Sequence, residues 1–118
     1  MPVCLNHLNL VVSDPDVAGA FFTTHFAFTV RTRHSALIVL DGLDGFVLVL
    51  MRARESEPAY PAGFHVGFLV ADEAAVDGEY ARLTAAGLDL PKPPRSMRGT
   101  YGFYFTALDD VLFEIAAR

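Results

Sequence analysis

Two histidines occupy matching places in the two halves of the chain, and imidazole nitrogens can bind a metal ion or hydrogen-bond a ligand. The stretch 63–70 alternates as a half-buried strand does, with one apolar face and with His65 and Gly67 on the other. The glycine leaves open space beside the imidazole. The stretch 5–12 has the same design and carries His7 on its less apolar face. The two histidines are 58 residues apart, about half of the chain, which indicates two related halves.

The two halves of the sequence superimpose when one is shifted by 58 residues. Under this shift Asp14 falls on Asp72, and both are good N-caps for a following helix. We therefore predict an α+β fold, a single domain over 1–118 built from two β-α-β-β-β units at about 3–52 and 63–117. Each unit should curl its strands around one helix as a half-barrel, and the two concave faces should make a cleft that both histidines face. The expected strands are 3–12, 28–33, 35–41, 46–51, 63–70, a short one within 88–100, 101–106 and 111–116, and the expected helices are 15–26 and about 73–87.

Length, composition and charge exclude several classes of protein. The chain has 118 residues, 53% of them hydrophobic and 19% charged, which is enough to bury a core. Its formal net charge of −5 argues against nucleic acid as a partner. No apolar run reaches the roughly 18–20 residues of a membrane span, and residues 1–4 lack the pattern of a secretory signal. Cys4 is the only cysteine, which excludes an internal disulfide and fits a reducing cytoplasm.

Three parts of the chain carry a resemblance to a known family, namely 6–12, 64–68, and 103–105 followed by 112–115. They resemble the vicinal oxygen chelate superfamily, which includes glyoxalase I, extradiol ring-cleaving dioxygenases, and fosfomycin- and bleomycin-resistance proteins. The resemblance covers nearly the whole chain and implies the same fold of two β-α-β-β-β units. It specifies activity less closely, because members with opposite functions share these stretches. The turn at 107–110 departs from the family pattern, in which many members carry Asp-Pro-x-Gly.

The resemblance also implies a metal-binding position in each first and last strand of the two units, which falls on His7, Val49, His65 and Glu114. Val49 cannot bind a metal, whereas the other three can. Two histidines and one carboxylate form a facial triad, which suits Fe or Mn and leaves positions open for substrate; Ni and Zn are also compatible. Glu114 lies in an otherwise apolar strand, where burying an unpaired carboxylate is costly. The alternative is that the histidines hydrogen-bond each other and Glu114 without a metal.

A ligand pocket is predicted around these positions. Tyr104 shares a strand face with Gly102 and Thr106, and the family match turns it toward the cleft. There it could hydrogen-bond a ligand or act as an acid in ring cleavage. The alternative is a tyrosine packed at the barrel rim. The residues predicted to line the pocket are Asn9, Val47, Val49, Met51, Gly67 and Tyr104.

Two functions follow, and the sequence leaves both open. The first is a binding protein, similar to the bleomycin-resistance-type members, that sequesters a flat, largely apolar compound such as an antibiotic. The missing ligand at Val49, its apolar neighbours and the absence of an evident general base favour it. The second is a divalent-metal-dependent enzyme, an extradiol-type dioxygenase or a glyoxalase-like lyase or isomerase, that uses His7, His65 and Glu114. Glyoxalase I itself is disfavoured, because its four-ligand shell needs a carboxylate or amide at position 49.

A homodimer is expected, because two curled, open half-barrels can close against a second copy of the chain with C2 symmetry. In glyoxalase-like members the cleft is shared between subunits, so the resemblance allows His7 and His65 of one site to come from different chains. The shape of the cleft depends on the loops at 52–62 and 91–100, which no motif fixes.

Overall fold

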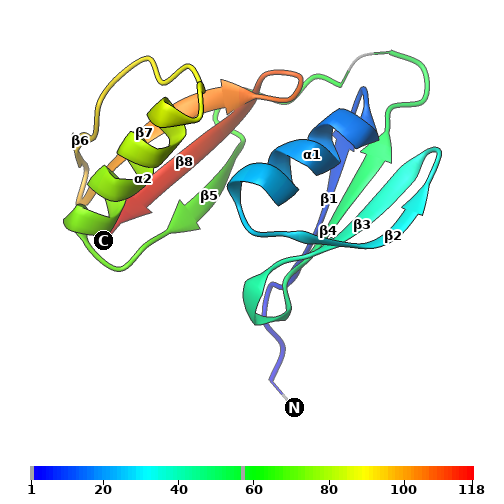
Figure 1. The fold of residues 1–118 in the computed structure, drawn as a ribbon, viewed down its shortest axis with the longest axis horizontal. Helices are drawn as coiled ribbons and strands as arrows, with labels where there is room; N and C mark the ends of the chain where they lie inside the picture. The colour runs from blue at the N-terminus through cyan, green and yellow to red at the C-terminus, as the bar shows by residue number, and fades with distance from the viewer. Residues whose placement is uncertain (1, 57) are drawn as a thin grey trace. The chain divides into compact units, whose positions relative to one another are not determined.

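The computed structural model describes residues 2–56 and 58–118, and its internal contacts divide the chain into two units, Met1–Ala59 and Tyr60–Arg118. Each unit contains one α-helix and one open four-stranded sheet (Figure 1). The predicted α+β fold of two β-α-β-β-β units is confirmed. No helix in the described ranges is long and apolar enough to cross a membrane.

Unit 1 follows the predicted order of elements. They are β1 (His7–Val12), α1 (Pro15–His25), β2 (Thr29–His34), β3 (Leu37–Asp41), a 3-10 turn (Leu43–Gly45) and β4 (Val47–Arg52). The sheet order is β1-β4-β3-β2, with β1 parallel to β4 and the other neighbours antiparallel. β1 and β4 can run parallel because α1 returns the chain to the end of the sheet where β1 begins, before β2, β3 and β4 follow.

Unit 2 repeats this topology. Its elements are β5 (His65–Leu69), α2 (Glu73–Ala85), β6 (Arg95–Met97), β7 (Thr100–Ala107) and β8 (Val111–Ala117). The sheet order is β5-β8-β7-β6, and β5 runs parallel to β8. The last strand of the unit therefore lies in the middle of the sheet, beside the first strand, as β4 lies beside β1 in unit 1.

Both helices begin at an aspartate cap. The Asp14 carboxyl accepts hydrogen bonds from the backbone N–H groups of Asp16 and Val17. The Asp72 carboxyl accepts one from the backbone N–H of Ala75, at 2.8 Å. These caps satisfy donors that have no partner inside the helix, and they lie at the equivalent positions that the 58-residue repeat predicts.

One face of each sheet packs against the helix of its own unit and forms the core. We call the opposite face of each sheet the open face. In unit 2, the Tyr80 ring of α2 meets the Phe103 ring of β7 edge-on, with ring centroids 5.3 Å apart. Side chains alternate along the strands, so every second residue faces the core. The larger core residues are Leu10, Val12, Phe22, Ile38, Leu40, Leu48 and Leu50 in unit 1, and Val76, Leu83, Phe103, Phe105, Val111, Phe113 and Ile115 in unit 2.

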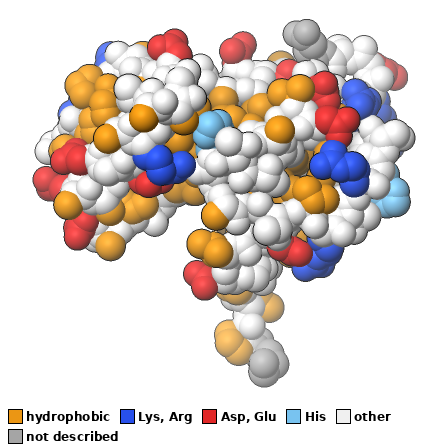
Figure 2. All heavy atoms as spheres, in the orientation of Figure 1, with side chains coloured by type: hydrophobic (Ala, Val, Ile, Leu, Met, Phe, Trp, Pro, Cys, Tyr) orange, Lys and Arg blue, Asp and Glu red, His pale blue; other side chains and the backbone are white. Residues whose placement is uncertain are grey.

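The structure differs from the predicted boundaries mainly at the start of the chain. β1 begins at His7 rather than residue 3, because its ladder with β4 starts at the pair His7 and Val47. Val3 and Leu5 are 96% and 91% exposed, and Figure 1 shows the N-terminal segment extending away from β1. On the face drawn in Figure 2, acidic and basic side chains are interspersed with hydrophobic ones.

Candidate functional site

Glu114 lies in the middle of β8, on the open face of unit 2, and is only 8% exposed. Its neighbours Phe113 and Ile115 belong to the core on the other face, so strand alternation turns the carboxyl away from α2. Across the sheet, Glu114 is paired with Gly67 of β5 on one side and Tyr104 of β7 on the other. This sheet register brings together residues that are far apart in the sequence.

His65 is held so that one ring nitrogen faces the Glu114 carboxyl. Its Nδ1 lies 2.9 Å from the backbone carbonyl oxygen of Gly63, which can only accept a hydrogen bond. Nδ1 therefore carries the proton in the neutral ring, and Nε2 presents its lone pair. Nε2 lies 3.6 Å from Oε1 of Glu114. Two electron-rich atoms face each other at this distance, and a proton or a metal cation between them would relieve their repulsion.

Tyr104 completes the cluster on the other side of Glu114. Its ring lies edge-on to the His65 ring, with centroids 5.8 Å apart and an interplanar angle of 86°. The pKa of the Tyr104 hydroxyl is raised above its ordinary value, first because the hydroxyl is hydrogen-bonded to the Glu114 carboxyl and second because it is partly desolvated. The hydroxyl therefore keeps its proton at neutral pH and acts as a hydrogen-bond donor.

Gly67 leaves space beside the Glu114 carboxyl. A Cβ atom built on Gly67 would lie 3.5 Å from Oε1 of Glu114, which is an ordinary van der Waals contact. An alanine would therefore fit, but a longer side chain at this position would cover the carboxyl. The absence of a side chain keeps Oε1 open from the direction of β5.

The nitrogen and oxygen of this cluster fit a divalent metal as two of its ligands. The separation of 3.6 Å between Nε2 and Oε1 is shorter than two metal–ligand bonds of about 2.1 Å laid end to end, so one ion could contact both atoms. The hydrogen bond from Nδ1 to a carbonyl is the support that metal-binding histidines usually have. In the described ranges no three histidine, cysteine, aspartate or glutamate side chains gather as a metal-binding group, so His7 as the third ligand stays a prediction.

The remaining predicted site residues lie on the open face of unit 1. Strand register pairs His7 with Val47 and Asn9 with Val49, and Met51 lies two residues further along β4. His7 and Asn9 are exposed, whereas the three apolar side chains are half-buried. This face therefore presents an apolar stripe beside polar residues. Whether it joins the cluster of unit 2 in one cleft stays a prediction.

Sequence reasoning missed the arginines around the cluster. A hollow of about 720 Å³ on unit 2 is lined by His65, Tyr104 and Glu114 together with Arg95, Arg98 and Arg118. The available signal was the position of three arginines after residue 90 in an otherwise acidic half of the chain. The strand that carries Arg95 is only three residues long, too short to give a readable alternation.

Replacing Glu114 by glutamine should lower the pKa of the Tyr104 hydroxyl toward the ordinary value of about 10, because the amide keeps a similar shape without the negative charge. A pH titration of the tyrosine ring carbons by NMR would measure it. Since the pKa is raised in the folded protein, the associated stability is present below the ordinary tyrosine pKa and is lost as pH rises through the folded one. Glu79→Gln, which alters a carboxyl paired with Arg82 on α2, is the control and should leave Tyr104 unchanged. Equal Tyr104 titrations in wild type and Glu114→Gln would contradict the assignment.

Comparisons with known proteins agree with the fold. The sequence profile of the Glyoxalase/Bleomycin resistance protein/Dioxygenase superfamily matches residues 4–115. The chain is similar to the structure of a possible glyoxalase from Bacillus cereus, with 36% identity, a TM-score of 0.82, and coverage of 97% of this chain and 98% of that chain. It is also similar to a genomically encoded fosfomycin resistance protein from Listeria monocytogenes, with 26% identity, a TM-score of 0.76, and coverage of 100% and 95%. A lactoylglutathione lyase from Agrobacterium tumefaciens shares the fold, with 20% identity, a TM-score of 0.80, and coverage of 98% and 94%. No curated protein sequence matches the chain.

Proposed function

The chain belongs to the glyoxalase/bleomycin resistance protein/dioxygenase superfamily, and from this premise we propose that it binds a flat, largely apolar small molecule on the open faces of its sheets and sequesters it unchanged. The observation that carries the proposal is Val49. It occupies a position where the family resemblance implies a metal ligand, yet its side chain is apolar and half-buried. Its register partner in β3 is Val39, so the apolar surface continues across the sheet.

An apolar stripe of this kind supplies affinity without chemistry. Removing apolar surface from water is worth about 25 cal/mol per Å², so a flat aromatic compound laid on Val47, Val49 and Met51 would gain several kcal/mol. Small-molecule sites are mostly apolar with a few polar groups that fix orientation. On the open face of unit 2, the Tyr104 hydroxyl and the His65 ring are suited to that second task.

A second candidate, a divalent-metal-dependent enzyme, is favoured by the arrangement of His65 and Glu114. The Nε2 and Oε1 atoms, 3.6 Å apart, would hold the metal, with His7 as the predicted third ligand. A bound Fe, Mn, Ni or Zn ion would polarise oxygen atoms of the substrate as a Lewis acid. Tyr104 would donate its proton or a hydrogen bond to the substrate. One similar structure is named as a fosfomycin resistance protein and another as a lactoylglutathione lyase, so the fold alone does not specify the function.

We further propose that the protein works as a C2 homodimer in the cytoplasm. In each described sheet the first strand, β1 or β5, is an edge strand, and unpaired edges favour pairing with another chain. Leu69 of β5 is 63% exposed, which adds apolar area to that edge. Cys4 is exposed and is the only cysteine of the sequence, which suits a reducing compartment.

Titration with 1,2-dihydroxyanthraquinone tests the proposed function, because this compound is flat and also carries the vicinal hydroxyls that ring-cleaving dioxygenases attack. We expect saturable binding at micromolar concentration, measured by calorimetry, with the compound recovered unchanged. Absence of binding would contradict the proposal. Conversion of the compound would favour the second candidate instead.

A further inference from the structure

The hollow on the open face of unit 2 combines a polar cluster with a concentration of positive charge. The cluster consists of His65, Tyr104 and Glu114, and the hollow has a volume of about 720 Å³. This volume falls within the range of small-molecule sites, roughly 300–1,000 Å³. Every residue that lines it belongs to unit 2, so the hollow is a property of this unit alone.

The arginines of unit 2 are not spread evenly. The unit contains four arginines, and one of them, Arg82, is bound by Glu79 on α2 at 2.7 Å. The other three, Arg95, Arg98 and Arg118, all line the hollow. Within the described ranges the guanidinium groups of these three make no hydrogen bond or ion pair, and all three residues are exposed. Since the whole chain carries a formal charge of −5, this gathering does not reflect a generally basic surface.

The sheet register explains why Arg95 reaches the polar cluster. Arg95 of β6 is paired with Gly102 of β7. Gly102 has no side chain that could stand between Arg95 and the neighbouring strands. Tyr104 lies two residues beyond Gly102, so Arg95 and Tyr104 occupy the same face as diagonal neighbours. Arg118 lines the same hollow as Arg95 and Tyr104, so both arginines border the polar cluster.

Arg98 enters the hollow from the turn between β6 and β7. Its backbone has φ of 41°, and the following Gly99 has φ of 83°, so both residues adopt the left-handed conformation that reverses the chain. The turn carries Arg98 on the opposite end of the hairpin from Arg95. An acidic group in the hollow could therefore be approached by guanidinium groups from more than one direction.

We propose that this hollow binds the oxyanion group of the ligand, a carboxylate or a tetrahedral oxyanion, with Arg95 and Arg98 as its main partners and Arg118 at the rim. The proposal rests on the proposed function and gives its flat, apolar ligand one acidic end. Planar guanidinium groups match the geometry of carboxylate and phosphate-like oxygens. Glu114 would not exclude the anion, because its carboxyl is almost buried and accepts the Tyr104 hydrogen bond, whereas the arginines are exposed.

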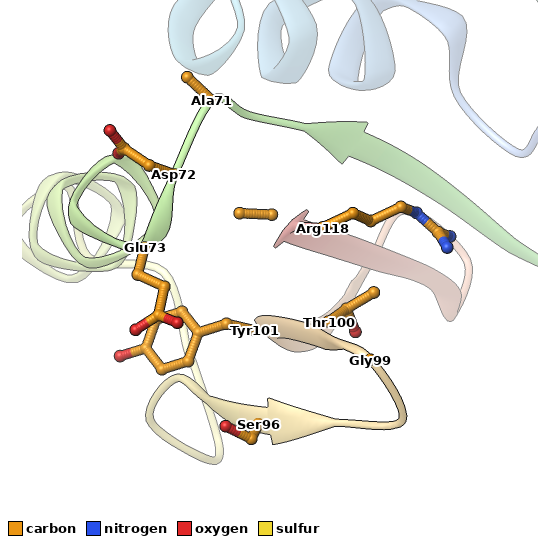
Figure 3. Close-up of a pocket in the computed structure, with 9 residues that line it drawn as sticks. Ala71, Asp72, Glu73, Ser96, Gly99, Thr100, Tyr101 and Arg118 are labelled. Carbon is orange, nitrogen blue, oxygen red and sulfur yellow. The ribbon is translucent and has the colours of Figure 1, made fainter.

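A second hollow on unit 2 is a poorer place for an anion. It has a volume of about 410 Å³, and its lining includes Asp72, Glu73, Tyr101 and Arg118. In Figure 3 the Glu73 carboxyl lies beside the Tyr101 ring, and the Arg118 side chain extends away from both. The Tyr101 hydroxyl donates to Asp77 at 2.6 Å. Two carboxylates and one arginine line this hollow, against one carboxylate and three arginines in the hollow around Glu114, so it is less suited to an oxyanion.

The test compares three anthraquinones that differ only in one substituent, the 2-carboxylate, the 2-sulfonate and the neutral 2-carboxamide, by isothermal titration calorimetry. We expect at least one of the two acids to bind about tenfold more tightly than the carboxamide, since hydrogen bonds to charged groups are the stronger ones. Arg95→Gln and Arg98→Gln should each weaken the binding of the preferred acid by about tenfold and leave the affinity for the carboxamide unchanged. Raising the salt concentration from about 0.1 M to about 1 M should weaken the binding of the two acids but not that of the carboxamide, because it shortens the Debye length from about 10 Å to about 3 Å.

The control is Arg82→Gln, which removes the same charge from unit 2 outside the hollow and should leave all three affinities unchanged. A preference for the carboxylate would identify a planar acid as the ligand group, and a preference for the sulfonate would identify a tetrahedral one. Equal affinities for the carboxamide and both acids would overturn the inference but not the proposed function. Acid binding that is insensitive to Arg95→Gln and Arg98→Gln would also overturn it. If none of the three compounds binds, both the inference and the proposed function fail.

Discussion

Val49→Glu is expected to weaken the binding of a flat aromatic ligand by about tenfold or more, because the new carboxyl would have to lose its water without gaining a partner. Strand register places Val49 between Asn9 of β1 and Val39 of β3, on the open face of unit 1. A ligand lying on this face would cover position 49. The measurement is a calorimetric titration with 1,2-dihydroxyanthraquinone.

Val17→Glu is the matched control for this substitution. Val17 lies on α1, is 59% exposed, and belongs to no open face. A glutamate at this position therefore introduces the same charge without touching the ligand. Ligand affinity should equal that of the wild type in this variant. Equal affinity in Val49→Glu and Val17→Glu would contradict the placement of the ligand. If the second candidate function holds, Val49→Glu should instead tighten metal binding, since it would supply the ligand that the family resemblance implies at this position.

If the second candidate function holds, Glu114→Ala is expected to lower the affinity of the purified, metal-free protein for Mn(II) by more than about 100-fold, because even residues that only support metal ligands contribute about 10–100-fold. Glu114 Oε1 and His65 Nε2 are the two atoms of unit 2 that one ion could contact together. Metal content and affinity would be measured by calorimetry and by elemental analysis after dialysis. In that case the wild type should hold close to one ion per chain.

Glu79→Ala controls for the loss of a carboxylate from unit 2, since Glu79 is paired with Arg82 on α2 and is remote from the open face. It should bind Mn(II) as the wild type does. A wild type that binds no divalent metal would favour the alternative in which His65 and Glu114 share a proton instead. Mn(II) binding that survives Glu114→Ala would show that the ion is held elsewhere.

The architecture could be predicted from the sequence because its signals are local and repeated. Alternation in 63–70 and 5–12, together with the equivalent caps Asp14 and Asp72, was enough to predict two β-α-β-β-β units. The start of β1 was misplaced, because alternation does not reveal where a strand loses its partner. In the structure, pairing with β4 begins at His7, and the apolar residues before it are exposed.

The candidate site was predictable only in part. Strand alternation correctly predicted that the side chains of Glu114 and His65 point away from the helix of their unit. The contact between Tyr104 and Glu114 depends on the register of β7 against β8, which no local pattern specifies. Arg95 and Arg98 were missed for the same reason, because they lie in a short strand and a turn after a proline-rich stretch and are brought to the site by the hairpin.

Sequestration and turnover differ most directly in the chemical state of the bound compound. Wild type and Glu114→Gln would be incubated with 1,2-dihydroxyanthraquinone in air, each with and without Fe(II), and the extracted compound analysed by mass spectrometry. The account predicts binding to both proteins with similar affinity and full recovery of the unchanged compound, because the ligand does not need the charge of the carboxylate. Oxidised or ring-opened compound formed by the wild type with Fe(II), and not by Glu114→Gln, would contradict sequestration and identify the protein as a metal-dependent enzyme.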